Sequence, residues 1–186
     1  PEQPIVDYLE QWHDRFWLFH PERPFWQVPE AEIGTKYTSA KLNGELSESG
    51  NKLRLFPAYA GTGKTELTYA QAARWLLYIN GFDDTSSKPK GTGLPSVGAG
   101  WLGKLGLIQA VGNNLFETLL MNLMLLQDAS KAWGEEKPCW ELDHPRSGER
   151  IEISQPDNPA ALLTLQSRRL LLYRNGDRVI GYALLG

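Results

Sequence analysis

The sequence is poor in the residues that build disulfides and metal centres. It has one cysteine, Cys139, which excludes an internal disulfide and fits a reducing compartment, so we expect a cytoplasmic protein. Its three histidines lie far apart, and none has a histidine or cysteine partner at the spacing of metal ligands. The sequence therefore predicts no metal ion, and we expect no other cofactor.

Long apolar runs and an excess of one charge are also missing. The longest apolar stretch, LLMNLMLL at 119–126, is too short to cross a bilayer, and no signal peptide is visible, so no membrane partner is expected. The formal net charge of −3 excludes a protein that coats nucleic acid through bulk positive charge. Local basic loops are still compatible with this charge balance.

The chain does contain enough apolar mass for a core. Of its 186 residues 41% are hydrophobic, and the seven tryptophans must be buried or presented to a partner. The chain begins at Pro1 without a methionine and stops inside an apolar run that is typical of a strand. We therefore expect one domain over residues 1–186, cut from a longer chain.

Three segments have the periodicity of helices. Apolar residues between Ile5 and Phe19 recur at spacings of three and four, and the prolines that follow end this predicted helix. A second helix is predicted over 69–80, with Gly81 as its stop. The segment 113–128 is apolar on most sides, so we expect a helix in the centre of the core.

The remaining segments predict short strands and long loops. Alternation at 52–56 indicates a strand, 105–111 favours another, and the apolar runs around Asn175-Gly176 predict a hairpin. The polar segment 30–50 and the glycine-rich segment 81–100 are expected to be loops. Together these elements predict an α+β fold, with helices packed on short antiparallel strands.

One motif suggests a nucleotide hydrolase. The stretch AYAGTGKT at 58–65 fits a relaxed P-loop, in which Gly63-Lys64-Thr65 would open a helix and bind phosphate and magnesium. However, Thr68 and Gln71 form a Thr-x-x-Gln capping box, which predicts that the next helix begins later. We therefore expect a surface loop here and keep the P-loop as the alternative.

Two further motifs are weaker. The formal G-x-G-x-x-G at 98–103 does not follow a buried strand, as a dinucleotide site requires. Cys139 lies near Asp143-His144, which could indicate cysteine chemistry. Since Pro145 follows directly, we expect a loop there and a half-buried Cys139 beside Trp140.

Six blocks together resemble one family. They are FWLFHPERPFWQ at 16–27, GNKLRLF at 50–56, LTYAQAARWLLYINGF at 67–82, GAGWLGKLG at 98–106, GNNLFETLLMNLMLL at 112–126 and LTLQSRRLLLYRNGDRV at 163–179. In this order they are similar to CasA, the large subunit of the type I-E Cascade CRISPR complex. The resemblance implies part of the large N-terminal domain of that subunit, without its C-terminal helical bundle.

The resemblance also implies a function. The family's large subunit has no known catalytic activity and recognises the protospacer-adjacent motif of double-stranded target DNA. It contacts the 5′ handle of the guide RNA and other Cascade subunits, and it helps to recruit a helicase-nuclease. In such complexes the protein reads only a short flanking motif, while the guide pairs with the rest of the target.

By this resemblance, a glycine loop reads the motif. Gly91 and Gly93, with Thr92 between them, match the motif-reading glycines; Gly98 and Gly100 are the alternatives, and plain loop flexibility is left open. Lys88 and Lys90 precede them and are expected to hold phosphates. The minor groove is narrow, so backbone without side chains can enter it closely, and glycine suits the task.

The resemblance implies a second contact, to the guide RNA and neighbouring subunits. It falls on Asn51, Lys52, Arg54 and Phe56, although an ordinary edge strand would show the same alternation. The segment 166–169 also matches the family, but solvated arginines at a strand entrance are the preferred interpretation. A purely structural scaffold subunit is the remaining alternative.

Overall fold

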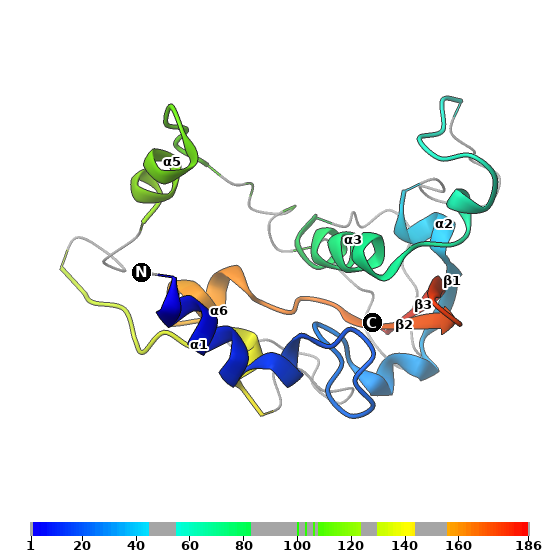
Figure 1. The fold of residues 1–186 in the computed structure, drawn as a ribbon, viewed down its shortest axis with the longest axis horizontal. Helices are drawn as coiled ribbons and strands as arrows, with labels where there is room; N and C mark the ends of the chain where they lie inside the picture. The colour runs from blue at the N-terminus through cyan, green and yellow to red at the C-terminus, as the bar shows by residue number, and fades with distance from the viewer. Residues whose placement is uncertain are drawn as a thin grey trace.

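The computed structural model of the chain contains helices and one antiparallel sheet (Figure 1). It describes residues 2–44, 55–82, 100, 103, 106, 108–123, 130–143 and 156–185. The helices and strands, with η for 3-10 helices, are α1 (Gln3–Gln11), η1 (His13–Phe16), η2 (Pro29–Ile33), β1 (Thr35–Thr38), α2 (Ser39–Leu42), η3 (Gly61–Lys64), α3 (Tyr69–Phe82), α5 (Leu115–Met121), η4 (Cys139–Glu141), α6 (Pro159–Leu163), β2 (Arg169–Asn175) and β3 (Arg178–Leu185). The predicted α+β fold is therefore confirmed.

The sheet has the order β1–β3–β2 and is antiparallel throughout. Strands β2 and β3 form the hairpin that Asn175-Gly176 predicts, with Asn175 paired to Arg178 across a two-residue turn. Gly176 has φ +58°, a left-handed conformation that glycine adopts without steric cost. The hairpin prediction is confirmed, and the turn itself consists of Gly176 and Asp177.

The prediction of a loop over 30–50 is wrong for 35–42, where the chain forms β1 and α2. Tyr37 on β1 stacks on Tyr182 of β3 with ring centroids 5.3 Å apart. Ser39 donates a hydrogen bond of 2.7 Å from its hydroxyl to the Val179 carbonyl oxygen. These contacts come from residues about 140 positions away, so local sequence pattern cannot predict them.

Helix α3 packs on the sheet and forms the main core with it (Figure 1). Ala72, Leu76 and Ile79 are buried on one face of the helix, at the three-to-four spacing of a helical stripe. Their core cluster includes Leu42, Leu67, Leu170, Leu172, Val179, Tyr182 and Leu184. The helix predicted over 69–80 is confirmed, but it continues through Gly81 to Phe82.

The first helix is shorter than predicted. The α-helix α1 ends at Gln11, and the chain then tightens into η1. This change brings Phe16 against two other aromatic rings, with centroid distances of 5.7 Å to Phe25 and 5.4 Å to Trp140. Aromatic packing with distant segments thus outweighs the local helical pattern.

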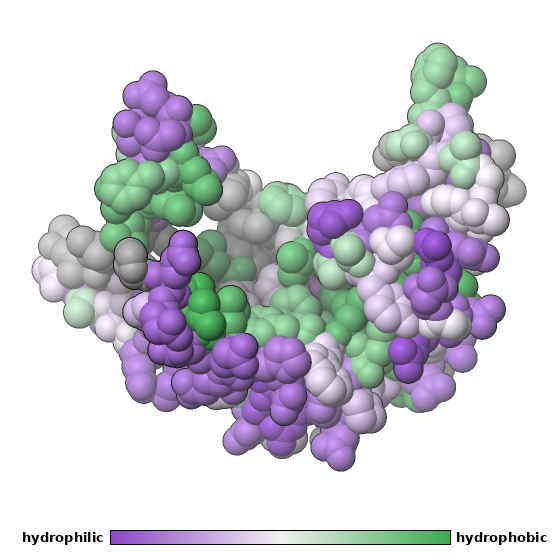
Figure 2. Space-filling view, in the orientation of Figure 1, coloured by the Kyte–Doolittle hydropathy of each residue, from purple (hydrophilic) through white to green (hydrophobic). Residues whose placement is uncertain are grey.

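Helix α5 contradicts the prediction of a central core helix. It stands apart from α3 and the sheet in Figure 1, and hydrophobic residues gather on it in Figure 2. Its apolar side chains are exposed, with Leu115 at 72%, Phe116 at 69% and Leu119 at 63%. Within this chain α5 therefore presents an apolar surface instead of burying it.

Two predicted strands do not form in the residues that can be judged. Leu55 and Phe56 lie in a bend, and 52–54 fall outside the described residues. Gly106 and residues 108–111 form no strand, while the rest of 105–111 is not described. Among the described helices, none has the length and apolar character needed to span a bilayer.

Candidate nucleic-acid interface

The glycine loop predicted to read DNA begins and ends at one place in the fold. Lys88, Lys90, Gly91, Thr92 and Gly93 lie outside the described residues, as does the alternative Gly98. The structure does describe the positions that bracket them. Residue 82 ends α3, and the backbone of residue 100 packs against that same helix end.

Gly100 packs against the C-terminal end of α3, and we call the contacting residues 81, 82 and 100 the loop stem. This packing argues against the predicted alternative role of Gly100 in the DNA minor groove. It is buried, and a Cβ at this position would collide with the backbone of Gly81 and Phe82. A Cβ at Gly103 would lie 3.3 Å from the Phe82 carbonyl oxygen, so this position also needs a small residue. Gly100 serves close backbone packing and is not available to a DNA groove.

Asn80 fixes the end of α3 from which the loop leaves. Its side chain is fully buried and donates a hydrogen bond of 3.1 Å to the Leu76 carbonyl oxygen within the helix. Its side-chain oxygen accepts a hydrogen bond of 3.1 Å from the Arg168 backbone N–H, and its carbonyl accepts one from the Ser167 hydroxyl. The loop stem is thus tied to the start of β2.

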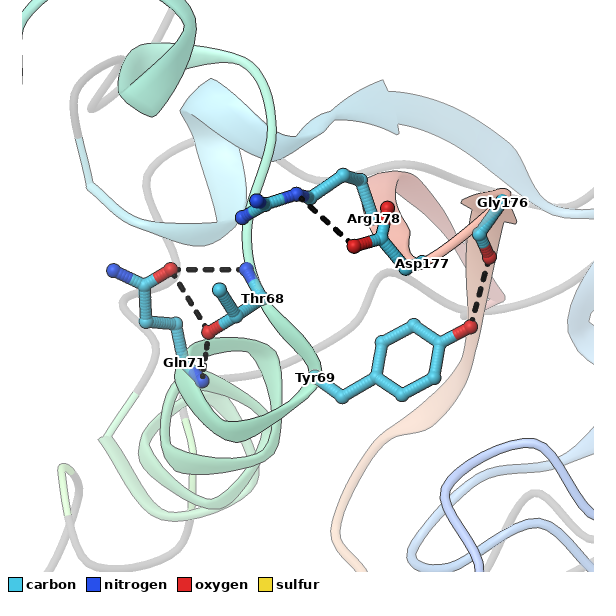
Figure 3. Close-up of polar contacts among 6 residues, drawn as sticks. All are labelled: Thr68, Tyr69, Gln71, Gly176, Asp177 and Arg178. Carbon is cyan, nitrogen blue, oxygen red and sulfur yellow. Dashed lines mark hydrogen bonds and ion pairs between the residues drawn. The ribbon is translucent and has the colours of Figure 1, made fainter.

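The other end of α3 is tied to the hairpin tip, as Figure 3 shows. The predicted capping box is confirmed, because the Thr68 N–H donates to Gln71 Oε1 at 2.9 Å and the Gln71 N–H donates to Thr68 Oγ1 at 3.2 Å. The Tyr69 hydroxyl donates to the Gly176 carbonyl oxygen at 2.9 Å and accepts from Arg174 at 3.1 Å. Both ends of α3 are therefore held by one hairpin.

The capping box also argues against the P-loop alternative. Gly61–Lys64 form the 3-10 turn η3, and α3 begins only at Tyr69, so no helix starts at Gly63-Lys64-Thr65. A P-loop needs a helix at that point, because the helix N-terminus and the loop amides bind the phosphates together. The geometry thus matches the surface loop that the capping box predicts.

The predicted guide-RNA contact is described at one of its four residues. Phe56 is 86% exposed, whereas Asn51, Lys52 and Arg54 lie outside the described residues. The excursion that carries them starts after α2 and is closed by a hydrogen bond of 3.3 Å from Asn43 to the Lys64 carbonyl oxygen. Phe56 thus offers a free aromatic surface on a segment anchored at its base.

Comparison with known families identifies the family. A model of the family described as CRISPR-associated protein Cse1 matches residues 1–183 of this chain. The chain belongs to the Cse1 family. It is 35% identical to the CasA/Cse1 protein of Thermus thermophilus over 192 aligned positions, which cover 98% of this chain and 36% of that protein. The chain therefore spans about a third of the length of that relative.

Solved structures agree with the Cse1 fold. The structure of Thermobifida fusca Cse1 has 30% identity and a TM-score of 0.73, covering 99% of this chain and 36% of its own. Thermus thermophilus CasA (Cse1) has 28% identity and a TM-score of 0.67 with the same coverage. A chain in a structure described as a CRISPR RNA-guided surveillance complex has 21% identity and a TM-score of 0.62, covering 99% of this chain and 38% of its own, a similarity of fold.

The segment 166–169 of this Cse1 family member differs from its prediction. Arg168 is 1% exposed and Arg169 is 2% exposed, so these are not the solvated arginines expected at the strand entrance. Burial lowers the pKa of Arg169. Two adjacent arginines gave no sequence signal of burial, and the hydrogen bond from the Arg168 N–H to Asn80 ties Arg168 to the loop stem.

Cys139 is buried, more fully than predicted. The residue is 7% exposed, and its backbone N–H donates to the Thr164 hydroxyl at 2.8 Å. Burial raises the pKa of Cys139 to about 11, although hydrogen bonds with Trp26 and Thr164 oppose this shift. The thiol is therefore protonated at neutral pH, whereas a nucleophilic cysteine must be a thiolate. His144 lies outside the described residues.

Proposed function

We propose that this chain is the DNA-reading part of a non-catalytic subunit in an RNA-guided CRISPR surveillance complex, and that it recognises the protospacer-adjacent motif of double-stranded target DNA. Its membership of the Cse1 family supports this proposal. On this proposal it corresponds to part of the N-terminal domain of a longer cytoplasmic protein. The guide RNA, the other Cascade subunits and a helicase-nuclease are its partners.

The single observation that carries the proposal is the shared base of residues 82 and 100. Their backbones are packed together at the end of α3, which Asn80 ties to the sheet. A loop that starts and ends on such a base is presented from a fixed platform. Preorganised placement lowers the ordering cost that binding must otherwise overcome.

The loop on this platform has the composition needed to read a minor groove. Gly91 and Gly93 bring bare backbone to the base edges, and Lys88 and Lys90 contact the flanking phosphates. The minor groove distinguishes mainly A·T from G·C pairs, so such a loop reads a short motif and leaves the rest of the target to the guide. This division of work agrees with the small net charge of the chain.

The second proposed contact is with the 5′ handle of the guide RNA and the adjoining subunits, through Asn51, Lys52, Arg54 and Phe56. The exposed ring of Phe56 supports it, since unstacked RNA bases stack on aromatic side chains. Replacing Phe56 with alanine is expected to weaken assembly with the guide-bearing complex and to leave folding unchanged. The ring makes no core contact that its loss would remove.

Bulky residues at the two loop glycines test the main proposal. The double variant Gly91→Leu, Gly93→Leu is assembled with the guide RNA and the other subunits, and binding to duplex targets with and without the motif is measured. We expect normal assembly and a loss of motif-dependent binding of at least about tenfold, since side chains cannot follow the backbone into the groove. Gly63→Ala is the matched control, because its nearest neighbours, atoms of Tyr59, lie at ordinary contact distances of 3.8 and 3.9 Å.

Two measurements separate this proposal from the scaffold and nucleotide-hydrolase alternatives. Unchanged target binding by the double variant would favour a purely structural scaffold. A thermal shift with Mg-ATP that disappears in Lys64→Ala would instead revive the nucleotide hydrolase. Neither result is compatible with the proposed reading of DNA by the glycine loop.

A further inference from the structure

A cavity of about 250 Å³ lies beside η1 and η4. It is enclosed by η1, the segment 22–30, η4 and Gln166, which are brought together from distant parts of the chain. Its described lining residues do not include Phe56, the one described residue of the predicted guide-RNA contact. Pockets for drug-sized ligands usually measure about 300–1,000 Å³, so this one lies just below the lower end of that range.

Aromatic rings form part of the cavity wall. Phe25 and Trp26 stack with their centroids 5.9 Å apart and an angle of 21° between their planes. Trp140 packs on Phe25 with ring centroids 6.4 Å apart, and it also lines the cavity. Trp26 holds a left-handed backbone conformation with φ 52°, which is uncommon for a bulky residue and costs about 1–3 kcal/mol. These flat surfaces suit a planar ring.

Gln166 adds an unused hydrogen-bond donor. Its side chain is 3% exposed, and its amide nitrogen has no hydrogen-bond partner among the residues that the structure describes. Leaving a buried donor unpaired is costly, so natural proteins seldom do so without a reason. Gln166 also lines the cavity, so a turn of its side chain would bring this donor to an acceptor on a ligand ring.

Two arginines at the cavity share one weakly held counter-ion. Asp143 Oδ1 lies 3.4 Å from Arg15 Nη2 and 3.8 Å from Arg23 Nη1. Both distances exceed the 2.7–2.9 Å that is typical of a strong charge-assisted bond. The Asp143 side chain is 81% exposed, whereas that of Arg15 is 15% exposed. An incoming phosphate can therefore replace Asp143 without breaking a buried pair.

We propose that this cavity binds one nucleotide, with the base against the aromatic wall and the phosphate on Arg15 and Arg23 in place of Asp143. The acceptor on the base pairs with Gln166. Glu22 and Glu30 also line the cavity and disfavour a run of phosphates, which limits the site to a single nucleotide. The inference uses residues outside the proposed DNA-reading loop, so either can fail without the other.

Calorimetric titration of the full chain tests this site with three probes: AMP, and mixed-sequence single-stranded RNA and DNA of about eight nucleotides. Arg23→Ala is expected to weaken binding about fivefold or more, and Gln166→Ala to weaken it about threefold. Asp143→Asn is expected to tighten binding about threefold, since it removes the competing anion. Arg178→Ala, an arginine on the hairpin paired with Asp177, is the matched control and should change nothing.

The pattern of results identifies the source of the nucleotide. Tighter binding of RNA or DNA than of AMP assigns the site to a strand, and equal binding assigns it to a free nucleotide. No binding of any probe at millimolar concentration would overturn the proposal. Weaker binding by Asp143→Asn would overturn it too, because that sign belongs to a cationic ligand. Since Asp143 is exposed, this variant is expected to fold even where the arginine variant does not.

Discussion

Replacing Asn80 with alanine should loosen the base from which the proposed DNA-reading loop leaves. The side chain is fully buried and makes two hydrogen bonds, one to the Leu76 carbonyl oxygen and one from the Arg168 N–H. Alanine keeps the helix propensity of the position high, so the change reports on these bonds and not on helix formation. It also leaves the backbone carbonyl that Ser167 contacts in place.

The expected loss of unfolding free energy follows from the buried polar groups that lose a partner in Asn80→Ala. Loss of the bond to Arg168 leaves a buried N–H without a partner, which costs about 1–3 kcal/mol. Loss of the bond to Leu76 adds about 0.5–1.5 kcal/mol, because that carbonyl belongs to the helical turn. Together these terms lower the free energy of unfolding by about 2–4 kcal/mol. Asn80→Asp keeps the acceptor for Arg168 but turns a second oxygen towards the Leu76 carbonyl, so it should also destabilise, and more so at high pH.

Urea denaturation monitored by tryptophan fluorescence measures these costs. In the assembled complex, Asn80→Ala is expected to weaken motif-dependent DNA binding as well, although the residue contacts no DNA in the proposal. A loss below about 0.5 kcal/mol in both variants would show that Asn80 does not anchor the helix end. Lost stability with unchanged DNA binding would show that the stem does not position the loop.

Three further predictions concern other parts of the fold. Thr68→Ala removes a helix cap and should lower the unfolding free energy by about 1 kcal/mol, whereas Thr65→Ala in the preceding loop should change it by less than about 0.5 kcal/mol in the same urea assay; equal effects would contradict the capping role. The pKa of Cys139 is raised from 9.0 to about 11, so the thiol ionises first in the unfolded state as pH rises. The contribution of the protonated Cys139 thiol to the free energy of unfolding is therefore complete below pH 9 and should fall by about 2–3 kcal/mol between pH 9 and 11. Cys139→Ala should not show this loss, and parallel pH profiles of the two proteins would refute the prediction. Leu119→Glu on exposed α5 should leave stability within about 0.5 kcal/mol and reduce self-association in sedimentation experiments, while Leu76→Ala in the core should cost about 2–5 kcal/mol; the reverse order would mean that α5 is buried.

The elements that the sequence predicts well are those whose signals are local. The capping box at Thr68 locates the start of α3 to the residue, and the turn at Asn175-Gly176 locates the hairpin. Both depend on backbone geometry that a few neighbouring residues determine. The same local signal also argues correctly against a helix at the P-loop motif.

The elements that the sequence predicts poorly depend on distant partners. Strand β1 exists because it pairs with β3, which lies far along the chain, and 30–50 shows no strand pattern of its own. The apolar segment 113–128 predicts burial, but apolar composition does not say which surface covers it, and α5 is exposed in this chain. The buried pair Arg168 and Arg169 is missed because arginine is rarely buried.

In the candidate site, too, the features that depend on distant contacts are the ones that the sequence does not predict. A family resemblance, and not residue chemistry, indicates the loop residues, whereas the stem becomes visible only through packing. Gly100 resembles its neighbouring loop glycines in sequence, yet its contact with the end of α3 gives it a different task. The cavity beside Gln166 has no counterpart in the sequence, because four separate segments enclose it.

The attachment of α3 at both ends makes its length a fixed dimension of the molecule. The 11 steps from Tyr69 to Asn80 rise about 17 Å along the helix, and these two residues are tied to Gly176 and Arg168. One residue inserted into the helix would rotate everything beyond it by about 100° and shift it by about 1.5 Å, so Asn80 would turn away from Arg168. The loops at either end of α3 can vary in length, whereas the number of residues between Tyr69 and Asn80 is set by these two contacts.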